Sequence, residues 1–341
     1  MNFPEEVRGE GELEEILSTP HPETVEEMTS VKGDIAILGA GGKIGPSLCA
    51  TAVKASGGKR RVYAISRFTK GDTERKLRAL GAEVIRADLS REEDVRDLPY
   101  AENVIFMVGR KFGTAEDPEL TWIVNSYIPS LVAKRFKGSR FAIFSTGNVY
   151  PLVPLNSGGA TEETPPSPVG EYGWSALARE RVFSHFLKRE GGKGVILRLN
   201  YANELRYGVL VDVALKVLKE EPIDLSMGYV NVIWQGDVNN ITLRALRLAS
   251  NPPAILNLTG PEVVSVRWVA SEFGRLLGRK TRFQGREEEK ALLSNAGRAF
   301  QLFGYPKVTL RTMVEWIAKW IASGKPTYGL PTHFEVRTGE F

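Results

Sequence analysis

Cysteine and histidine are nearly absent from this sequence of 341 residues, which contains one cysteine and three histidines. The single cysteine, Cys49, excludes an intramolecular disulfide, and the apolar segment around it (SLCATAV) is typical of a small buried core residue. His21, His185 and His333 lie far apart from one another and from Cys49, so no spacing typical of a zinc site is present. We therefore expect no metal site.

Long apolar runs and clusters of one charge are also missing. No apolar run approaches the ~18 residues of a membrane span, and the acidic N-terminus (MNFPEEVRGEGELEEIL) lacks the apolar core of a secretory signal. The net charge of +4 comes from interspersed Lys, Arg, Asp and Glu without a long basic block, which argues against a nucleic-acid partner. We expect a cytoplasmic protein that binds neither membranes nor nucleic acid.

Short apolar segments and helical patterns alternate up to residue 200, which is typical of an α/β fold with a doubly wound parallel sheet and helices on both faces. The predicted strands are residues 34–40, 61–66, 83–88, 103–109, 140–146 and 194–200. The predicted helices among them are residues 44–55, 73–80 and 120–136. After residue 200 the alternation becomes irregular. There the pattern predicts helices over 209–220, 266–278 and 311–322, and strands over 230–234 and 254–260.

The first predicted strand ends in a glycine-rich loop that leads directly into a helix. Gly39, Gly42 and Gly45 have the spacing G-x-x-G-x-x-G, which permits a tight turn, close approach of a pyrophosphate, and close packing of helix on strand. Ile44 excludes the strict G-x-G-x-x-G motif, and it also excludes a P-loop, because no Ser or Thr follows Lys43. We expect the whole loop to bind a dinucleotide: Gly39, Gly41, Gly42, Lys43, Ile44 and Gly45.

The end of the second strand indicates which cofactor binds. A free ribose 2′-hydroxyl favours an acidic residue there, but this chain has Ser66 and Arg67, which suit a 2′-phosphate. We therefore expect NADP, with NAD as the alternative, since Arg67 is otherwise a solvated surface residue. Asp88 and Leu89 end the third strand, where the carboxylate either contacts the adenine or caps the segment after Ser90.

Taken in order, residues 33–322 resemble the extended short-chain dehydrogenase/reductase family of NAD(P)-dependent sugar epimerases and dehydratases. The resemblance rests on the glycine loop, Asp88-Leu89, Asn125, the segment STGNVY (145–150), EYGWS (171–175) with Glu180, and VNVIWQGDV with Asp237. It implies a Rossmann fold with a smaller C-terminal substrate-binding lobe. It also implies cofactor contacts from Val108, Gly109, Asn125 and Ser145, and substrate contacts from Arg110, Gly147, Asn148 and Asn200.

The same resemblance implies that Tyr172 is the catalytic acid/base and that Thr146 bonds the reacting oxygen. The family places a lysine four residues after this tyrosine, where it lowers the tyrosine pKa and holds the nicotinamide ribose, but Ala176 stands there in this chain. An unperturbed tyrosine has a pKa of about 10 and is a poor base at neutral pH. Lys111 or Arg110 is a candidate for the missing charge, and Arg179, two turns along the helix, is a weaker one. Alternatively, all three are solvated or form structural ion pairs.

The second departure from the family follows the sixth strand. The chain there reads RLNYANELRYG in place of the family's usual turn, so Asn200 lies near, but not in clear register with, the family's Asn that contacts a nucleotide-sugar. We expect an epimerase, dehydratase or reductase acting on a sugar, a sugar acid or a related polyhydroxy compound. The alternative is a nicotinamide-cofactor-binding sensor or scaffold without hydride transfer. The absence of the family's lysine at Ala176 is the reason to consider it.

The expected domains are an N-terminal extension (1–32), a Rossmann domain (33–200 and about 228–258), a substrate-binding lobe (201–227 and 259–325) and a C-terminal tail (326–341). The spacing of Leu13, Ile16 and Leu17 predicts that the extension packs on the domain. The tail either docks on the protein or reaches over a neighbouring site. By resemblance, the helices over 120–136 and 172–188 form the contact of a homodimer.

Overall fold

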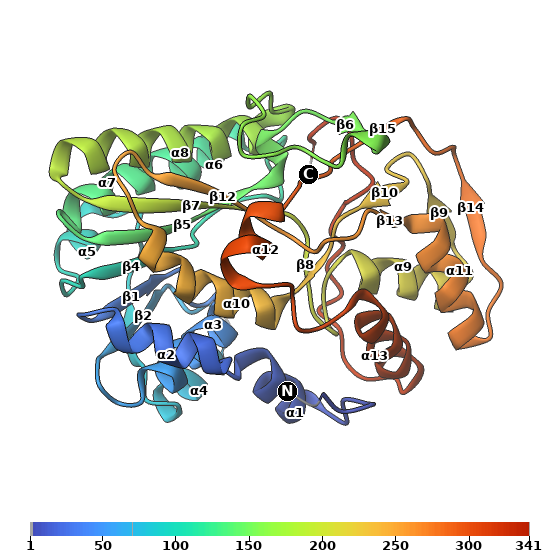
Figure 1. The fold of residues 1–341 in the computed structure, drawn as a ribbon, viewed down its shortest axis with the longest axis horizontal. Helices are drawn as coiled ribbons and strands as arrows, with labels where there is room; N and C mark the ends of the chain where they lie inside the picture. The colour runs from blue at the N-terminus through green and yellow to red at the C-terminus, as the bar shows by residue number, and fades with distance from the viewer. Residues whose placement is uncertain (1–2, 70, 341) are drawn as a thin grey trace.

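A seven-stranded parallel sheet organises the computed structural model, which describes residues 3–69 and 71–340. Its strand order is β12-β7-β5-β4-β1-β2-β3, as in a doubly wound fold (Figure 1). The strands are β1 (Ile35–Leu38), β2 (Val62–Ser66), β3 (Glu83–Arg86), β4 (Asn103–Phe106), β5 (Arg140–Thr146), β7 (Lys193–Leu199) and β12 (Ala254–Leu258). The predicted α/β class and these seven strands are confirmed.

Both faces of the sheet are buried. Successive residues of each strand point to opposite faces, so each strand contributes to two apolar clusters. In β1, Ile35 and Ile37 face one apolar cluster while Ala36 and Leu38 face another. One face is covered by α3 (Gly45–Ser56), α4 (Thr73–Ala79) and α10 (Gln235–Ala245), and the other by α5 (Glu92–Arg96), α7 (Ile128–Arg135) and α8 (Gly170–Glu190) (Figure 1). Cys49 is fully buried in the first cluster, as expected.

The helix predicted over 120–136 is interrupted. The chain forms α6 (Pro118–Trp122), a π-helical turn η1 (Ile123–Tyr127) and then α7. Pro129 lacks an N–H, so the α-helical hydrogen bond to the carbonyl of Asn125 cannot form, and a wider turn precedes the proline. Asn125 lies in this turn and is fully buried.

The single strand predicted over 230–234 is wrong. Tyr229–Val230 (β10) pairs antiparallel with β13 (Val264–Ser265), whereas Ile233–Trp234 (β11) pairs parallel with β8 (Ala202–Asn203). Asn231 separates the two strands, because its side chain donates to the Glu262 carbonyl and accepts from the Ser294 N–H. The sequence pattern also missed α10 and α12 (Gly297–Phe303).

A third apolar cluster fills a lobe beside the C-terminal part of the sheet. The lobe is built around α9 (Val209–Leu218), α11 (Val266–Leu277) and α13 (Leu310–Ala322), on the right in Figure 1. Two-residue or three-residue strand pairs edge it: β9 (Pro222–Asp224) with β14 (Arg282–Gln284), and β6 (Val153–Pro154) with β15 (Lys290–Ala291). No helix among the described residues is long and apolar enough to cross a bilayer.

The N-terminal extension packs on the sheet domain through α1 (Glu10–Ser18) and α2 (Pro22–Ser30), as its apolar spacing predicted (Figure 1). Leu13 and Leu17 are buried. Asn239 of α10 donates from its amide to the Leu17 carbonyl over 2.9 Å, and Asn240 accepts from the His21 N–H over 2.7 Å. Polar side chains of α10 therefore fix the backbone that joins α1 to α2.

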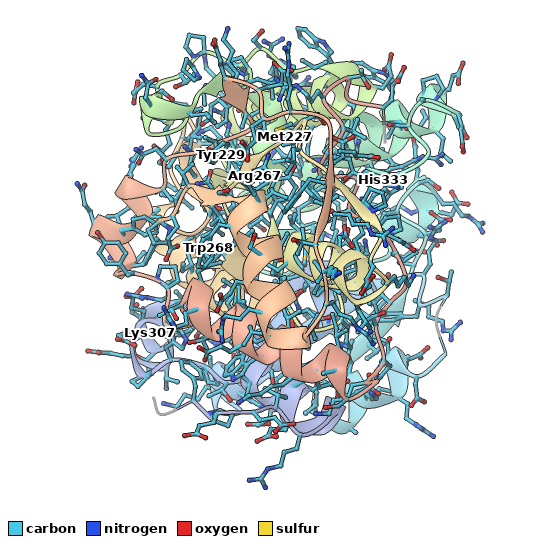
Figure 2. All side chains as sticks on the ribbon, turned by 90° about the vertical axis from the view of Figure 1, so that its right-hand side faces the viewer. Met227, Tyr229, Arg267, Trp268, Lys307 and His333 are labelled. Atoms are coloured by element: carbon cyan, nitrogen blue, oxygen red, sulfur yellow. The ribbon has the colours of Figure 1, made fainter. Side chains whose placement is uncertain are left out.

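The C-terminal tail docks along the lobe. Phe334 is buried, and the Arg337 guanidinium donates to the carbonyls of Ser226 and Lys290. Figure 2 shows His333 of this tail and Met227 on the same face of the lobe. Thr332 brings the tail over the sheet, since its carbonyl accepts from the Lys111 ammonium over 2.9 Å. The tail thus covers part of the site described below.

His21 and Asp237 meet where the extension contacts α10, with 3.7 Å between Nε2 and Oδ1. Burial, assisted by the charge of Lys307, lowers the pKa of His21 from 6.5 to about 4. Burial raises the pKa of Asp237 from 3.8 to about 6, although the N–H groups of Lys307 and Val308 donate to its carboxylate. Near pH 7 the histidine is therefore neutral and the aspartate ionised.

These two shifts have opposite effects on the free energy of unfolding. His21 binds its proton more weakly in the folded chain, so its contribution is complete above pH 6.5 and is lost as the pH falls toward about 4. Asp237 holds its proton more tightly in the folded chain, so its contribution is present below pH 3.8 and is lost as the pH rises to about 6. In the wild type the two contributions nearly cancel.

We predict that Asp237→Asn uncovers the His21 contribution, because the amide oxygen still accepts from the backbone while the opposing titration is gone. Urea unfolding should show the variant gaining on the order of 3 kcal/mol relative to wild type between pH 4 and pH 6.5. Adding His21→Asn to Asp237→Asn should remove this dependence. If the free energy of unfolding depends on pH in the same way in Asp237→Asn and wild type, the opposing contributions of His21 and Asp237 would be contradicted.

Candidate active site

The glycine loop joins β1 to the N-terminus of α3 in a conformation that requires glycine at both ends. Gly39 has φ +95°, and a Cβ there would lie 3.1 Å from the Met107 carbonyl carbon. At Gly45 a Cβ would lie 2.4 Å from the Ala40 carbonyl oxygen, so only glycine lets the helix start this close to the strand. The loop therefore offers the open N-terminus of α3, a 12-residue helix, to an anionic group.

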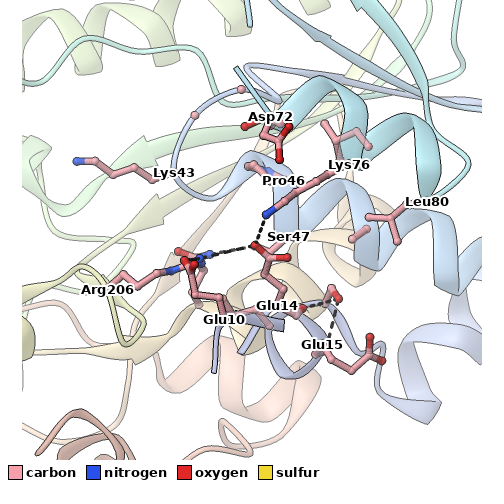
Figure 3. A pocket seen from close by; sticks show the side chains of 18 of the residues that line it. Glu10, Glu14, Glu15, Lys43, Pro46, Ser47, Asp72, Lys76, Leu80 and Arg206 are labelled. Carbon is pink, nitrogen blue, oxygen red and sulfur yellow. Dashed lines mark hydrogen bonds and ion pairs between the residues drawn. The ribbon is translucent and has the colours of Figure 1, made fainter. Parts of the chain in front are cut away.

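A cavity of about 580 Å³ lies beside this loop (Figure 3). Gly41, Gly42 and Lys43 line it on one side, and α1 closes the other side with Glu10 and Glu14. Figure 3 shows the ion pairs that cross the cavity wall: Arg206 with Glu10 and Glu14, and Lys76 with Glu14 at 3.0 Å. The sequence does not reveal this role of α1, because nothing in its acidic pattern indicates which surface the helix faces.

At the ends of β2 and β3, Arg67 and Asp88 lie 4.0 Å apart and Arg67 is largely exposed. The Asp88 carboxylate accepts from the Ser90 hydroxyl over 2.7 Å and from the Ser90 N–H over 3.1 Å. The hydroxyl hydrogen bond is the main cause that lowers the pKa of Asp88. Asp88 thus fixes the turn that contains Leu89, and Arg67 has the freedom of a surface side chain.

A second cavity, of about 280 Å³, brings together the residues predicted for catalysis. Thr146, Tyr172 and Lys111 line it, with Asn148 and Asn200 among the polar groups around them. It shares Lys43 and Gln235 with the first cavity, so the two cavities meet at the glycine loop. Sequence-distant segments that follow β4, β5 and β7 thus converge at the carboxyl edge of the sheet.

Thr146 ends β5 with its hydroxyl set for donation. The Asn148 N–H and side-chain amide both donate to Thr146 Oγ1, over 3.2 and 3.1 Å. The hydroxyl proton of Thr146 is therefore available to an oxygen in the cavity. Gly147 sits against Asn200, because a Cβ on it would lie 3.1 Å from Asn200 Cγ.

Ser145 faces away from Thr146, into a buried ion pair. Its hydroxyl donates to Glu180 Oε1 over 2.5 Å. Arg198 of β7 binds the same carboxylate in bidentate fashion, over 3.0 and 2.7 Å, and all three side chains are buried. Arg198 was not singled out from the sequence, although an arginine within an otherwise apolar strand was the available signal.

Lys111 follows β4 and reaches the second cavity beneath the tail. Its ammonium group donates to the Thr332 carbonyl. Burial, together with the charge of Lys43, lowers the pKa of Lys111 to about 8, against the raising effect of Asp212 and Glu335. A lysine with this pKa carries its charge at pH 7 and loses it within the range in which enzymes work.

Arg110 and Asn125 hold the same loop in place. The Asn125 amide accepts from the Arg110 N–H over 2.9 Å and donates to the Arg110 carbonyl over 3.0 Å. The Arg110 guanidinium donates to the Gly113 carbonyl and lies 4.0 Å from Asp117, so it bonds within its own loop. Val108 lies against the glycine loop, because a Cβ on Gly39 would be 3.2 Å from its nitrogen.

No cluster of three or more His, Cys, Asp or Glu side chains within residues 3–69 and 71–340 could hold a metal ion. The arrangement instead combines an anion-accepting helix N-terminus with a neighbouring hydroxyl, phenol and ammonium group. Such a set can orient a polyhydroxy compound and move a proton to or from one of its oxygens.

Comparison with known proteins agrees with this geometry. The sequence model described as "NAD dependent epimerase/dehydratase family" matches residues 35–203. Among solved structures, the fold is similar to UDP-glucose 4-epimerase of Thermus thermophilus in complex with NAD, at 21% identity and TM-score 0.70, covering 84% of this chain and 98% of that one. A comparison with curated proteins finds no significant match.

Two further structures show the same similarity. UDP-glucuronic acid 4-epimerase from Bacillus cereus, in complex with UDP-glucuronic acid and NAD, is 20% identical with TM-score 0.70, covering 85% of this chain and 99% of that one. UDP-glucose 4-epimerase of Thermotoga maritima, with UDP-glucose, is 16% identical with TM-score 0.71 and the same coverage. Residues 35–203 therefore form a domain of the NAD dependent epimerase/dehydratase family, within a chain that folds like the sugar epimerases.

Proposed function

We propose that this protein is an NAD(P)-dependent epimerase, dehydratase or reductase that acts on a sugar, a sugar acid or a related polyhydroxy compound. The observation that carries the proposal is the second cavity, where Thr146 and Tyr172 face the same space as Lys43 of the glycine loop. In this proposal the sheet domain, with the boundaries given above, binds the cofactor, and the C-terminal lobe completes the substrate site.

The residues fit a dinucleotide. At Gly39 and Gly45 a Cβ would clash with the backbone of Met107 and Ala40, so glycine allows the close packing that leaves the N-terminus of α3 open to a pyrophosphate. A bound nicotinamide would supply the site with hydride exchange at the carbon that carries the reacting oxygen. Gly41, Gly42, Lys43 and Ile44 would hold the pyrophosphate side, with Val108, Gly109, Asn125 and Ser145 shaping the wall toward the nicotinamide.

Tyr172 would take the proton from the reacting hydroxyl and return it to the resulting carbonyl. Thr146 would donate its hydroxyl hydrogen bond to the same oxygen, because Asn148 occupies its acceptor side. Lys111, which lines the same cavity, would stabilise the negative charge that develops on the reacting oxygen and would orient the substrate. Arg110 would act through the loop that it stabilises, since its guanidinium bonds within that loop.

The second cavity suits a polyhydroxy compound, because Asn148, Asn200 and Gln235 surround it with amide donors and acceptors. Two of the three similar structures named above contain UDP-glucose or UDP-glucuronic acid, which supports a sugar as the reacting part. Tyr201 and Tyr207, in the segment that departs from the family pattern, also line the cavity and would select among sugars.

We predict that Tyr172→Phe lowers turnover by about 10²-fold or more while leaving the affinity for nicotinamide cofactor within about twofold, because it removes one transferable proton. Turnover would be followed with a panel of polyols, keto-sugars and nucleotide-sugars, by absorbance at 340 nm for net oxidation or reduction and by proton NMR of the substrate for redox-neutral epimerisation or dehydration. Tyr100→Phe, at an exposed position, is the matched control. Full activity in Tyr172→Phe would refute its role. Tight cofactor binding by wild type without turnover on any panel member would favour a sensor or scaffold.

The proposed cofactor preference rests on Arg67, whose exposed guanidinium follows the end of β2 and would bind a 2′-phosphate there. We predict that wild type binds NADPH at least about tenfold more tightly than NADH, and that Arg67→Ala removes most of this difference. Nicotinamide fluorescence titrations would measure both. Arg61→Ala, at the opposite end of β2 and similarly exposed, should change neither affinity. Tighter binding of NADH by wild type would overturn the NADP preference alone.

We also propose a homodimer that forms through α6, the adjoining turn η1 and α8. Trp122, Ile123 and Trp174 are 40%, 42% and 48% exposed there, an unusual concentration of large apolar side chains on one surface. We predict that Trp174→Glu converts a dimer to a monomer in light-scattering measurements. Trp268→Glu on α11, also at a 48% exposed tryptophan, should leave the assembly unchanged. A monomeric wild type would contradict the proposal.

A further inference from the structure

Tyr172, Ala176 and Arg179 occupy one face of α8, at positions i, i+4 and i+7. Ala176 is fully buried, so nothing longer than a methyl group projects from the place of the family's lysine. Arg179 projects from the same face one turn later, and its side chain is also buried, with 4% of the residue exposed. The long cationic side chain of Arg179 therefore extends into the protein interior next to Ala176.

The guanidinium of Arg179 bonds only neutral groups. It donates to the Phe144 carbonyl over 3.0 Å and to Asn125 Oδ1 over 2.5 Å. Its Nε is buried and has no hydrogen-bond partner in the described part of the chain. Within that same part, no carboxylate lies within the 4.0 Å of an ion pair with Arg179. The positive charge is therefore not compensated by a fixed anion.

Glu180, the neighbour of Arg179 in sequence, is already neutralised. Both of its carboxylate oxygens bond the Arg198 guanidinium, at 3.0 and 2.7 Å. The cluster of Arg179, Glu180 and Arg198 consequently carries one net positive charge in a buried position. An uncompensated buried charge is strongly unfavourable unless an anion forms near it.

Tyr172 lies on the same face of α8 as Arg179 and lines the second cavity. Burial lowers the pKa of Arg179, while the phenol of Tyr172, followed by Glu180, acts to raise it, so the tyrosine and the guanidinium interact electrostatically. The guanidinium also lies directly against the loop after β4, since a Cβ on Gly109 would be 2.7 Å from Arg179 Nη2. The charge therefore lies directly behind the loop after β4, which in the proposed function forms part of the cofactor wall.

We propose that Arg179 supplies the positive charge that stabilises deprotonated Tyr172, in place of the lysine that Ala176 replaces. This inference rests on the proposed role of Tyr172 as acid/base. An arginine suits the position, because it keeps its charge when buried and needs no change of protonation during turnover. Through Asn125, which bonds the Arg110 backbone, Arg179 also fixes the loop that carries Lys111.

Other titratable groups face Tyr172 from the elements packed around it. Lys43 of the glycine loop, Lys111 after β4, and Tyr201 and Tyr207 after β7 line the same cavity. Lys111 is the principal competitor for the role, so the experiment compares the two cations directly.

The test is an ultraviolet difference titration that follows phenol ionisation in the protein without cofactor or substrate. Subtracting a Tyr172→Phe twin from each protein isolates one tyrosine among the 10 in the chain. In Arg179→Gln, which keeps hydrogen-bond donors but loses the charge, the midpoint of Tyr172 ionisation should rise by about one pH unit or more. Arg179→Lys should move it much less, and Ala176→Lys added to Arg179→Gln should return it toward wild type.

An unchanged midpoint in Arg179→Gln overturns the proposal, as does a rise seen in Lys111→Met but not in Arg179→Gln. If Arg179→Gln does not fold, the double variant Ala176→Lys/Arg179→Lys decides. A second cation beside the first should lower the midpoint further, and no change contradicts an electrostatic effect at this face of α8. Because no ligand is used, these outcomes are independent of the turnover and cofactor measurements that test the proposed function.

Discussion

The buried ion pair between Glu180 and Arg198 is the contact on which the candidate active site depends. It joins α8 to β7, and through the Ser145 hydroxyl it joins both to the end of β5. Thr146 follows Ser145 at the end of β5 and Tyr172 lies about two turns before Glu180 on α8, so the pair holds together the two elements that carry them. Removing either partner would leave a buried charge alone, which is far more unfavourable than loss of an exposed ion pair.

The same junction explains why a second arginine is tolerated one residue before Glu180. Because Arg198 satisfies the carboxylate, Arg179 is directed to the carbonyl of Phe144 and the amide of Asn125. Asn125 reaches this point because Pro129 forces a π-helical turn into the helix after β4. A proline in one helix and an alanine in another thus together place a cation near the proposed acid/base.

The two ends of the chain enclose the site from outside the sheet. The extension brings Glu10 and Glu14 to the cavity beside the glycine loop, where Arg206 and Lys76 pair with them. In the tail, the Thr332 carbonyl accepts a hydrogen bond from the Lys111 ammonium group. Neither segment has a recognisable motif, and both acquire their place through long-range hydrogen bonds to α10 and to the C-terminal lobe.

The sequence by itself determined the α/β class, the seven sheet strands and the glycine loop, because these depend on local periodicity and on glycines that only one backbone geometry requires. It also identified Thr146 and Tyr172 as candidate site residues, and in the fold both line the same cavity. Only the tertiary structure decided the break at Asn231, the turn around Asn125 and the partners of Arg179 and Arg198. Each of these depends on contacts between residues far apart in the chain, and no pattern of neighbouring residues encodes which distant group will satisfy a buried charge.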